Sequence, residues 1–196
     1  MKVVLVVILI IVVVVAGMVL MTMVRHGLSS REQPTLMEEG IARAVRHLAT
    51  PLSMRHVRNP VPLTSDVLAE ARAHWADHCA TCHGNDGSGN TEIGRNLYPK
   101  VPDMRRKRTQ SLTDGELFSI IKNGVRLTGM PAWGDAAGHD DADNWKLVHF
   151  IRHLPKITPQ ELEEMKSMNP RNPMEIKEEK EEEQFLKGSE APSHHH

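Results

Sequence analysis

The sequence predicts an all-α protein in which a single transmembrane helix precedes a small helical domain. Three observations predict this fold class. The stretch from Val3 to Val24 is apolar and uncharged, and several later segments repeat apolar residues at helical spacing. No segment alternates apolar and polar residues as a half-buried strand would. A length of 196 residues allows one ordinary domain with additions at its ends.

The composition excludes several classes of function. Lysine and arginine together number 24, and aspartate and glutamate number 25, which gives a formal net charge of −1. A nucleic-acid-binding domain usually has a clear basic excess, so we expect no nucleic acid partner. The two cysteines are too few for a disulfide-stapled scaffold, an iron–sulfur cluster held by four thiolates or an all-cysteine zinc site.

Residues 1–24 are predicted to be a transmembrane signal-anchor helix in a lipid bilayer. As a helix the apolar run would be ~33 Å long, enough to cross a hydrocarbon core of about 30 Å. A cleaved signal peptide is the main alternative, but its apolar region is normally about 7–15 residues long. Here apolar residues continue beyond the small pair Ala16-Gly17. Basic residues flank both ends, at Lys2 and Arg25, so charge leaves the orientation open.

Residues 25–64 are predicted to be a tether between this helix and the domain. Four prolines interrupt the segment, which favours extended, semi-rigid backbone. Between them, apolar residues at helical spacing predict a short amphipathic helix at about 36–49. Its apolar residues are Leu36, Met37, Ile41, Val45 and Leu48, with Arg43 and Arg46 on the other side. Two placements remain open: the helix packs on its own domain, or it lies on the membrane surface or against a partner.

Residues 65–155 are predicted to be the globular domain. Three helices are expected, from Ser65-Asp66 to about Cys79, from the capping box Thr113-Asp114-Gly115-Glu116 to about Asn123, and from about Asp141 to Leu154. Gly124 and Pro155 end the second and third helices. Only 4% of the residues are aromatic. The core of so small a domain, with so few aromatic side chains, would be only marginally stable by itself. We therefore expect a further group to occupy its centre.

Residues 156–196 are predicted to be a short helix followed by a charged, partly disordered tail. A second capping box, Thr158-Pro159-Gln160-Glu161, begins the helix, which should run to about Met168. Almost continuous charge from Glu175 to Glu183 favours a solvated extension. The chain ends in three histidines, which fit either a natural terminus or the remnant of an affinity tag.

The segment Cys79-Ala80-Thr81-Cys82-His83 has the Cys-x-x-Cys-His spacing of a c-type haem attachment site. Two thiols three positions apart lie one helical turn apart and match the two vinyl groups on one haem edge. Each thiol would form a thioether, and His83 would supply the proximal nitrogen to the iron. A thioredoxin-type pair is disfavoured, because a helix rather than a strand precedes the cysteines. A zinc site would need two further ligands at close spacing.

Met130 is the predicted second axial ligand of the iron, in the loop Gly129-Met130-Pro131-Ala132-Trp133. A thioether is a soft, neutral ligand, and histidine–methionine ligation raises the haem potential. The alternatives are Met104, a histidine (His139, His149 or His153) or an open position. Most methionines only fill cores, and this is the role predicted for Met37 and Met165.

With these motifs in place, residues 65–155 resemble a class I c-type cytochrome with one haem. The matching features are Ala71 and Trp75 in the first helix, the haem motif, the Met130 loop and the last helix Asn144–Leu154. The resemblance implies a cytochrome c fold, with three main helices around one covalent haem c held by Cys79, Cys82, His83 and Met130. It also implies that a proline carbonyl, of Pro99 or Pro102, accepts the other ring N–H of His83. Nothing carries over to the segments outside this range.

The resemblance further implies a single-electron carrier rather than an enzyme, without a small-molecule substrate. Such domains receive haem on the outer face of a bacterial-type cytoplasmic membrane, so we expect a single-pass protein with its haem domain in the periplasm. The expected partners are membrane redox complexes: a quinol-oxidising complex, and a terminal oxidase or photosynthetic reaction centre. A fixed haem subunit of a larger respiratory or photosynthetic complex is the alternative. A haem sensor or peroxidase would need a displaceable Met130.

Two further patterns have both a functional and a structural explanation. The pairs His74/His78 and His149/His153 each share one helix face and could bind a metal ion, although this spacing is common by chance. Arg105–Arg108 is a basic run between the haem motif and the Met130 loop. It could steer an acidic redox partner toward the haem edge, or it could be an ordinary solvated loop.

Overall fold

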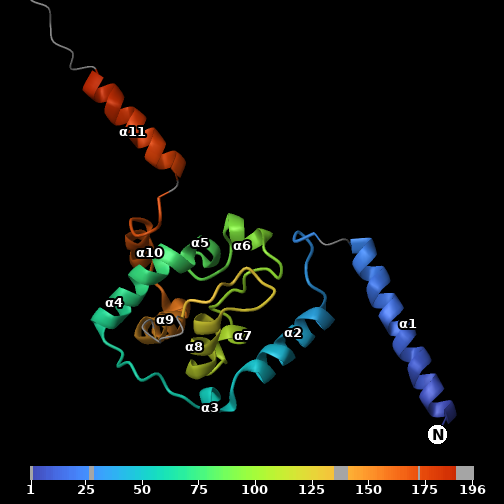
Figure 1. The fold of residues 1–196 in the computed structure, drawn as a ribbon. Helices are drawn as coiled ribbons and strands as arrows, with labels where there is room; N and C mark the ends of the chain where they lie inside the picture. The colour runs from blue at the N-terminus through green and yellow to red at the C-terminus, as the bar shows by residue number, and fades with distance from the viewer. Residues whose placement is uncertain (1, 27–28, 135–140, 172, 189–196) are drawn as a thin grey trace, which may run out of the picture.

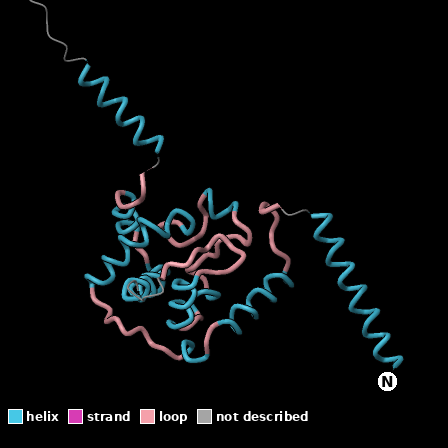
Figure 2. Tube along the Cα trace, viewed as in Figure 1, coloured by secondary structure: helices cyan, strands magenta, loops and turns pink. Residues whose placement is uncertain are grey.

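The computed structural model describes residues 2–26, 29–134, 141–171 and 173–188. Within these ranges the chain is helical and has no β-strand, which confirms the predicted all-α class (Figure 2). The elements are α1 (Lys2–His26), α2 (Leu36–Ala49), α3 (Leu52–Arg55), α4 (Ser65–His74), the π-helix η1 (Trp75–Cys79), α5 (Ala80–His83), α6 (Glu92–Asn96), α7 (Lys107–Gln110), α8 (Asp114–Asn123), α9 (Asp141–His153), the 3₁₀ helix η2 (Leu154–Lys156), α10 (Pro159–Lys166) and α11 (Pro173–Gly188).

The N-terminal helix α1 is one continuous helix of 25 residues. Its segment Lys2–Thr22 is long and apolar enough to cross a membrane. None of that segment is buried within the protein, and α1 lies apart from the other helices in Figure 1. An exposed apolar surface of this length is compatible with lipid and unfavourable in water.

The core of the domain lies between α4, α8 and α9 (Figure 1). Helix α4 packs across α9, and the small side chain at Ala71, 1% exposed, is buried there. The large apolar side chains along the predicted last helix are buried: Trp145, Leu147, Val148, Phe150, Ile151 and Leu154. Phe118 of α8 stacks on Trp145 with ring centroids 4.1 Å apart. The three predicted helices therefore build this core.

One predicted cap is shifted by a residue. The N-cap of α4 is Thr64 rather than Ser65, because the Thr64 hydroxyl accepts the backbone N–H of Val67. The capping box at Thr113 is formed as predicted, and α8 ends at Gly124, whose φ of 64° favours glycine. The last helix is also close to prediction, since α9 passes into the short 3₁₀ helix η2 at Leu154.

The segments on both sides of residues 65–155 pack against the domain. Met54, Val57 and Val61 are half-buried against the core, and Asn59 Nδ2 donates to the carbonyl of Trp145 at 2.8 Å. On the other side, the predicted helix after Thr158 is formed as α10, and its Met165 is completely buried. Met165 is thus a core residue, as predicted, and the short helix adds to the core.

Helix α2 has the predicted bounds, with Thr35 and Glu38 forming a capping box. Its apolar side chains, however, face solvent, and none of its residues is buried. The prediction that Met37 is a core residue is wrong, because its side chain is 66% exposed. The cause is that α2 contacts the domain through its polar side, at Glu39 and His47.

The charged tail forms the 16-residue helix α11 within the described part of the chain. The described side chains from 181 to 186 are exposed, in agreement with a solvated extension. The three terminal histidines lie outside the described residues.

Candidate haem site

The haem motif lies where a π-helix passes into an α-helix. Cys79 is the last residue of η1, whereas Cys82 and His83 belong to α5. A π-turn inserts one extra residue and is frequent at functional sites. The helix then ends at Gly84, whose φ of 76° is a backbone conformation that favours glycine. The chain thus turns away sharply, directly after the proximal histidine.

The Trp75 side chain holds this turn in place through a hydrogen bond and ring contacts. The side chain is 1% exposed, and its indole Nε1 donates to the Gly84 carbonyl at 3.0 Å. Its ring centroid lies 5.6 Å from that of His83 and 5.4 Å from that of Phe150. The aromatic position predicted in the first helix therefore supports the histidine directly and connects it to α9.

His83 has the properties of a neutral metal ligand. Its side chain is buried, and desolvation lowers the pKa of the imidazole to about 4. The ring is therefore uncharged near pH 7, the form that binds a metal. Its buried Nδ1 has no hydrogen-bond partner, so neither Pro99 nor Pro102 accepts a bond from that atom here. A buried polar atom without a partner is rare in a folded domain and is compatible with a bound group at this site.

The two cysteines lack the lowered pKa that thiol–disulfide exchange of the thioredoxin type requires. Both are unpaired and partly buried. Burial raises the pKa of the Cys79 thiol to about 12, with a smaller contribution from Cys82, and burial also raises the pKa of Cys82. Exchange of the thioredoxin type needs a lowered pKa and a thiolate. The structure thus disfavours the dithiol alternative.

Close backbone contacts hold the loop after the motif. The Gly89 N–H donates to the His83 carbonyl at 2.8 Å, and the Thr91 hydroxyl donates to the Cys82 carbonyl at 3.1 Å. Gly94 of α6 lies so close to the carbonyls of Cys82 and Gly89 that a β-carbon would clash with both. These contacts were not predicted, because only the fold reveals which residues after the motif approach it.

The Met130 loop leaves the end of α8, turns tightly and returns to the same helix. The Val125 N–H donates to the Met130 carbonyl and the Met130 N–H to the Thr128 hydroxyl, both at 3.1 Å. The loop returns to α8 where the Trp133 N–H meets the Ile121 carbonyl at 3.1 Å. At Gly129 a β-carbon would meet the side chain of Leu97. The loop therefore packs against the segment that follows the haem motif.

The alternatives to Met130 have other roles in the described structure. Met104 packs against the hydrophobic core, and its N–H donates to the Gly87 carbonyl at 2.8 Å. His149 Nε2 lies 2.7 Å from the Val61 carbonyl, and His153 Nε2 lies 2.8 Å from Glu161. His139 lies outside the described residues. Met130 thus stays the predicted second ligand.

The arginines of the basic run form ion pairs within the protein. Arg105 pairs with Asp86 at 2.9 Å and with Asp103 at 2.8 Å. Arg106 also pairs with Asp103, at 3.0 Å, and Arg108 pairs with Glu39 of α2 at 3.1 Å. These contacts favour the structural explanation of the run over the steering of a partner.

The paired histidines do not form a metal site in the described part of the chain. No group of three or more histidine, cysteine, aspartate or glutamate side chains is arranged there to hold a metal ion. His74 and His78 pack edge to face, with ring centroids 5.0 Å apart.

Comparison with protein families agrees with this geometry. Residues 66–151 match the family model described as cytochrome C oxidase, cbb3-type, subunit III. This part of the chain is a c-type cytochrome domain. No curated protein shows a significant match to the chain. The match covers the haem motif, the Met130 loop and most of α9, and so includes every residue on which the resemblance was based except the end of the last helix.

The cytochrome domain carries one covalently bound haem c. In the chain this domain follows an N-terminal helix that is long and apolar enough to cross a membrane. A domain of this kind indicates haem-based electron transfer. The predicted cytochrome c fold is thereby confirmed.

Proposed function

We propose that the protein is a single-electron carrier whose haem iron is held by His83 and Met130. The observation that carries this proposal is the Cys-x-x-Cys-His motif of a c-type cytochrome domain, with the neutral imidazole of His83 buried against Trp75. When bound, the haem supplies a centre for reversible one-electron oxidation.

Each residue of the site has a distinct task. Cys79 and Cys82 would attach the group covalently, and His83 and Met130 would bind its iron. With both of these ligands supplied by the protein, no position would remain for a substrate. Trp75 and the buried residues of α9 keep water from the histidine side. Exclusion of water keeps the polar surroundings fixed as the charge changes, which suits rapid electron transfer.

The location follows from the anchor and the attachment chemistry. We propose that α1 spans the cytoplasmic membrane once and that the haem domain lies in the periplasm. Anchorage raises the effective concentration of the domain beside membrane-bound redox complexes. The proposed partners are a quinol-oxidising complex as electron donor and a terminal oxidase or reaction centre as electron acceptor.

A second candidate is a fixed haem subunit of a larger complex. It is favoured by the family model itself, whose description names a subunit of a cbb3-type oxidase. Electrophoresis in mild detergent with haem staining separates the two proposals. A haem band at the size of the free chain supports a mobile carrier, and a band only at a much larger size supports a fixed subunit.

Carbon monoxide tests the proposed ligation against a sensor or peroxidase function. The purified full-length protein is reduced at neutral pH and exposed to the gas. We expect an unchanged visible spectrum, because Met130 occupies the position that carbon monoxide would need. Rapid binding would show a displaceable ligand and would contradict a simple electron carrier.

A further inference from the structure

Helix α2 turns its apolar side to solvent and its polar side to its own domain. Met37, Ile41, Val45 and Leu48 recur at helical spacing and share one face; we call them the α2 stripe. Their exposed fractions are 66%, 58%, 59% and 78%. This is the reverse of the usual arrangement, in which the apolar face of a surface helix covers the core. The stripe therefore requires a partner outside the domain.

The polar side of α2 fixes the direction in which the stripe points. Glu39 pairs with Arg108 of α7 at 3.1 Å, and His47 Nδ1 lies 3.2 Å from Glu116 of α8. Arg46, on the same side, is partly buried, and desolvation is the main reason why its pKa is lowered. Rotating α2 about its axis so that the stripe faces the domain would break the pairs made by Glu39 and His47. The helix therefore holds one orientation on the domain.

Contacts beside α2 keep this side of the domain close to the anchor helix. Lys100 Nζ donates to the Ser30 carbonyl at 2.7 Å, and Tyr98 is hydrogen-bonded to Glu38 of α2. Ser30 is only four residues beyond His26, the last residue of α1. Four residues span at most ~14 Å. The side of the domain that carries α2 must therefore lie near the point where α1 ends.

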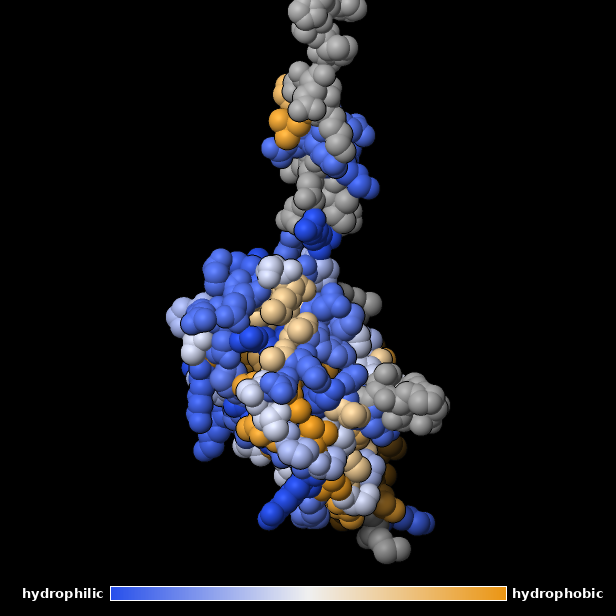
Figure 3. Space-filling view, turned by 90° about the vertical axis from the view of Figure 1, so that its left-hand side faces the viewer, coloured by the Kyte–Doolittle hydropathy of each residue, from blue (hydrophilic) through white to orange (hydrophobic). Residues whose placement is uncertain are grey.

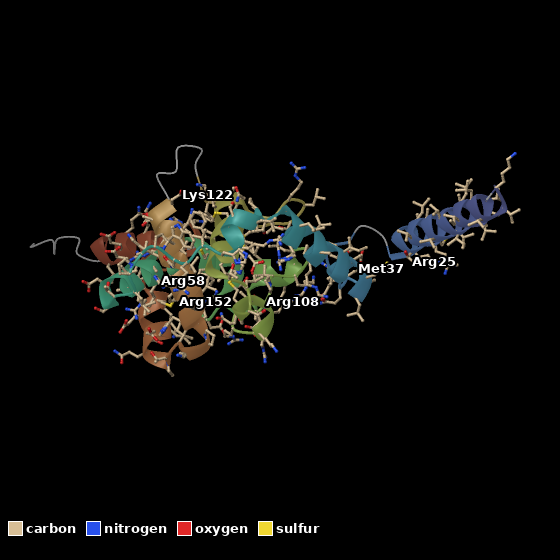
Figure 4. All side chains as sticks on the ribbon, turned by 90° about the horizontal axis from the view of Figure 1, so that it is seen from below. Arg25, Met37, Arg58, Arg108, Lys122 and Arg152 are labelled. Atoms are coloured by element: carbon tan, nitrogen blue, oxygen red, sulfur yellow. The ribbon has the colours of Figure 1, made fainter. Side chains whose placement is uncertain are left out.

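The figures agree with this placement. Figure 4 shows Met37 on the end of α2 that faces α1, and Arg25 on the facing end of α1. Figure 1 shows α1 and α2 on the same side of the domain. The face that carries α4 and α10 is mostly hydrophilic, with smaller apolar areas (Figure 3).

The charge of this region suits lipid headgroups. Between residues 25 and 64 the sequence has six arginines, no lysine and three glutamates. Basic residues next to a membrane span are attracted to anionic headgroups. An amphipathic helix beside them can bury its apolar face at the boundary between headgroups and acyl chains. Both properties suit a bilayer surface with anionic headgroups, and the nearness of the apolar helix α1 favours this surface over a protein groove.

We propose that α2 lies in the surface of the same bilayer that α1 spans, with the α2 stripe against the lipid. The helix then holds the cytochrome domain in one orientation, through Glu39 and His47. Tyr98 contacts α2, and its neighbour Leu97 packs against Gly129 of the Met130 loop. The Met130 loop is therefore placed near the membrane, where membrane-bound redox partners would contact it. This proposal concerns orientation and does not depend on the identity of the iron ligands.

Site-directed spin labelling of the full-length holoprotein tests the proposal. Both native cysteines are consumed by the haem, so an introduced cysteine is the one thiol to be labelled. The stripe variants are Ile41→Cys and Val45→Cys. The matched controls are Ala42→Cys, exposed on the same helix, and Ala73→Cys, exposed on α4. Each labelled protein is placed in phosphatidylcholine–phosphatidylglycerol vesicles, and its collisions with oxygen and with a water-soluble nickel chelate are measured.

We expect the two stripe labels to gain collisions with oxygen and lose collisions with the nickel chelate, relative to both controls. Stripe labels as accessible to the nickel chelate as Ala73→Cys would overturn the proposal. Stripe labels shielded from both reagents would also overturn it, because a second copy of the chain would then cover α2. The visible spectrum of the same samples reports the haem separately, so a failure of iron ligation would be distinguished from a failure of membrane docking.

Discussion

The indole Nε1 of Trp75 donates a hydrogen bond of 3.0 Å to the carbonyl oxygen of Gly84. Trp75 lies four residues before Cys79, and Gly84 directly follows His83. The bond therefore closes the turn that contains Cys79, Cys82 and His83. It connects the buried Trp75 of η1 to the residue at which the haem motif ends, so packing of the core also fixes the position of His83.

Removing this bond while keeping an aromatic ring should destabilise the site. Trp75→Phe leaves the partly buried Gly84 carbonyl without its donor, which costs about 1–3 kcal/mol of unfolding free energy. We also expect less haem per polypeptide. Trp145→Phe is the control, because that side chain loses similar volume but its ring stacks on Phe118 without a hydrogen bond within the described part of the chain. Denaturant unfolding and haem content of both variants provide the check, and equal haem loss in the two would contradict the role of the bond.

Gly94 should not tolerate a side chain. In Gly94→Ala the new methyl group would meet the carbonyls of Cys82 and Gly89, so the backbone at the haem motif must move. Overpacking of this kind costs about 1–3 kcal/mol. Gly40→Ala is the control, since nothing lies within 4 Å of a β-carbon there and alanine favours a helix by up to about 1 kcal/mol. Thermal unfolding should show opposite shifts for the two variants; a harmless Gly94→Ala would mean that α6 does not pack as described.

The helix α10 should contribute to the stability of the domain. Met165 is completely buried, whereas Met37 is 66% exposed. Met165→Ala should therefore lower the free energy of unfolding by about 2–5 kcal/mol, whereas Met37→Ala should change it by less than about 0.5 kcal/mol. Denaturant titrations followed by haem absorption measure both values. Similar small effects would show that α10 is not part of the cooperative unit.

Low pH should weaken the interaction between the Asp103 carboxylate and the Arg105 side chain, which we call the Arg105 clamp. Hydrogen bonds from the Arg105 side chain, above all, lower the pKa of Asp103 to about 2. A carboxyl group with a lowered folded-state pKa stabilises the protein above its unfolded value of about 4, and this contribution disappears as the pH falls toward 2. The stability difference between the native protein and Asp103→Asn should thus be largest near neutral pH and vanish near pH 2.

Melting temperatures across this pH range test the Asp103 prediction. Asp66→Asn is the control, because Asp66 is exposed in the first turn of α4 and has no arginine partner in the described structure. A difference for Asp103→Asn that stays constant down to pH 2 would contradict the Arg105 clamp.

Local signals made much of this structure predictable from the sequence. The capping boxes predicted at Thr113 and Thr158 are formed by bonds between neighbouring residues, so a short window of sequence contains them completely. The apolar spacing on α9 likewise identified its buried side. The haem motif was recognisable because the reaction with two vinyl groups requires a fixed spacing of Cys79, Cys82 and His83.

What the sequence did not reveal depends on long-range contacts. Gly94 approaches Cys82 only after α6 folds against α5, and no pattern within α6 indicates that. Met37 was predicted to be a core residue because most methionines fill cores, but residue type does not tell which side of α2 meets the domain. That choice is made by the ion pairs from Glu39 and His47 to residues far along the chain.

The most direct test of the central claim is the visible spectrum of the purified protein, oxidised and then reduced, beside Met130→Ala and Met104→Ala. Ligation by His83 and Met130 predicts a sharp reduced α band and a weak red band from methionine bound to ferric iron. That red band should vanish in Met130→Ala and persist in Met104→Ala. A red band that survives loss of Met130, or a high-spin spectrum of the unmodified protein, would contradict the account.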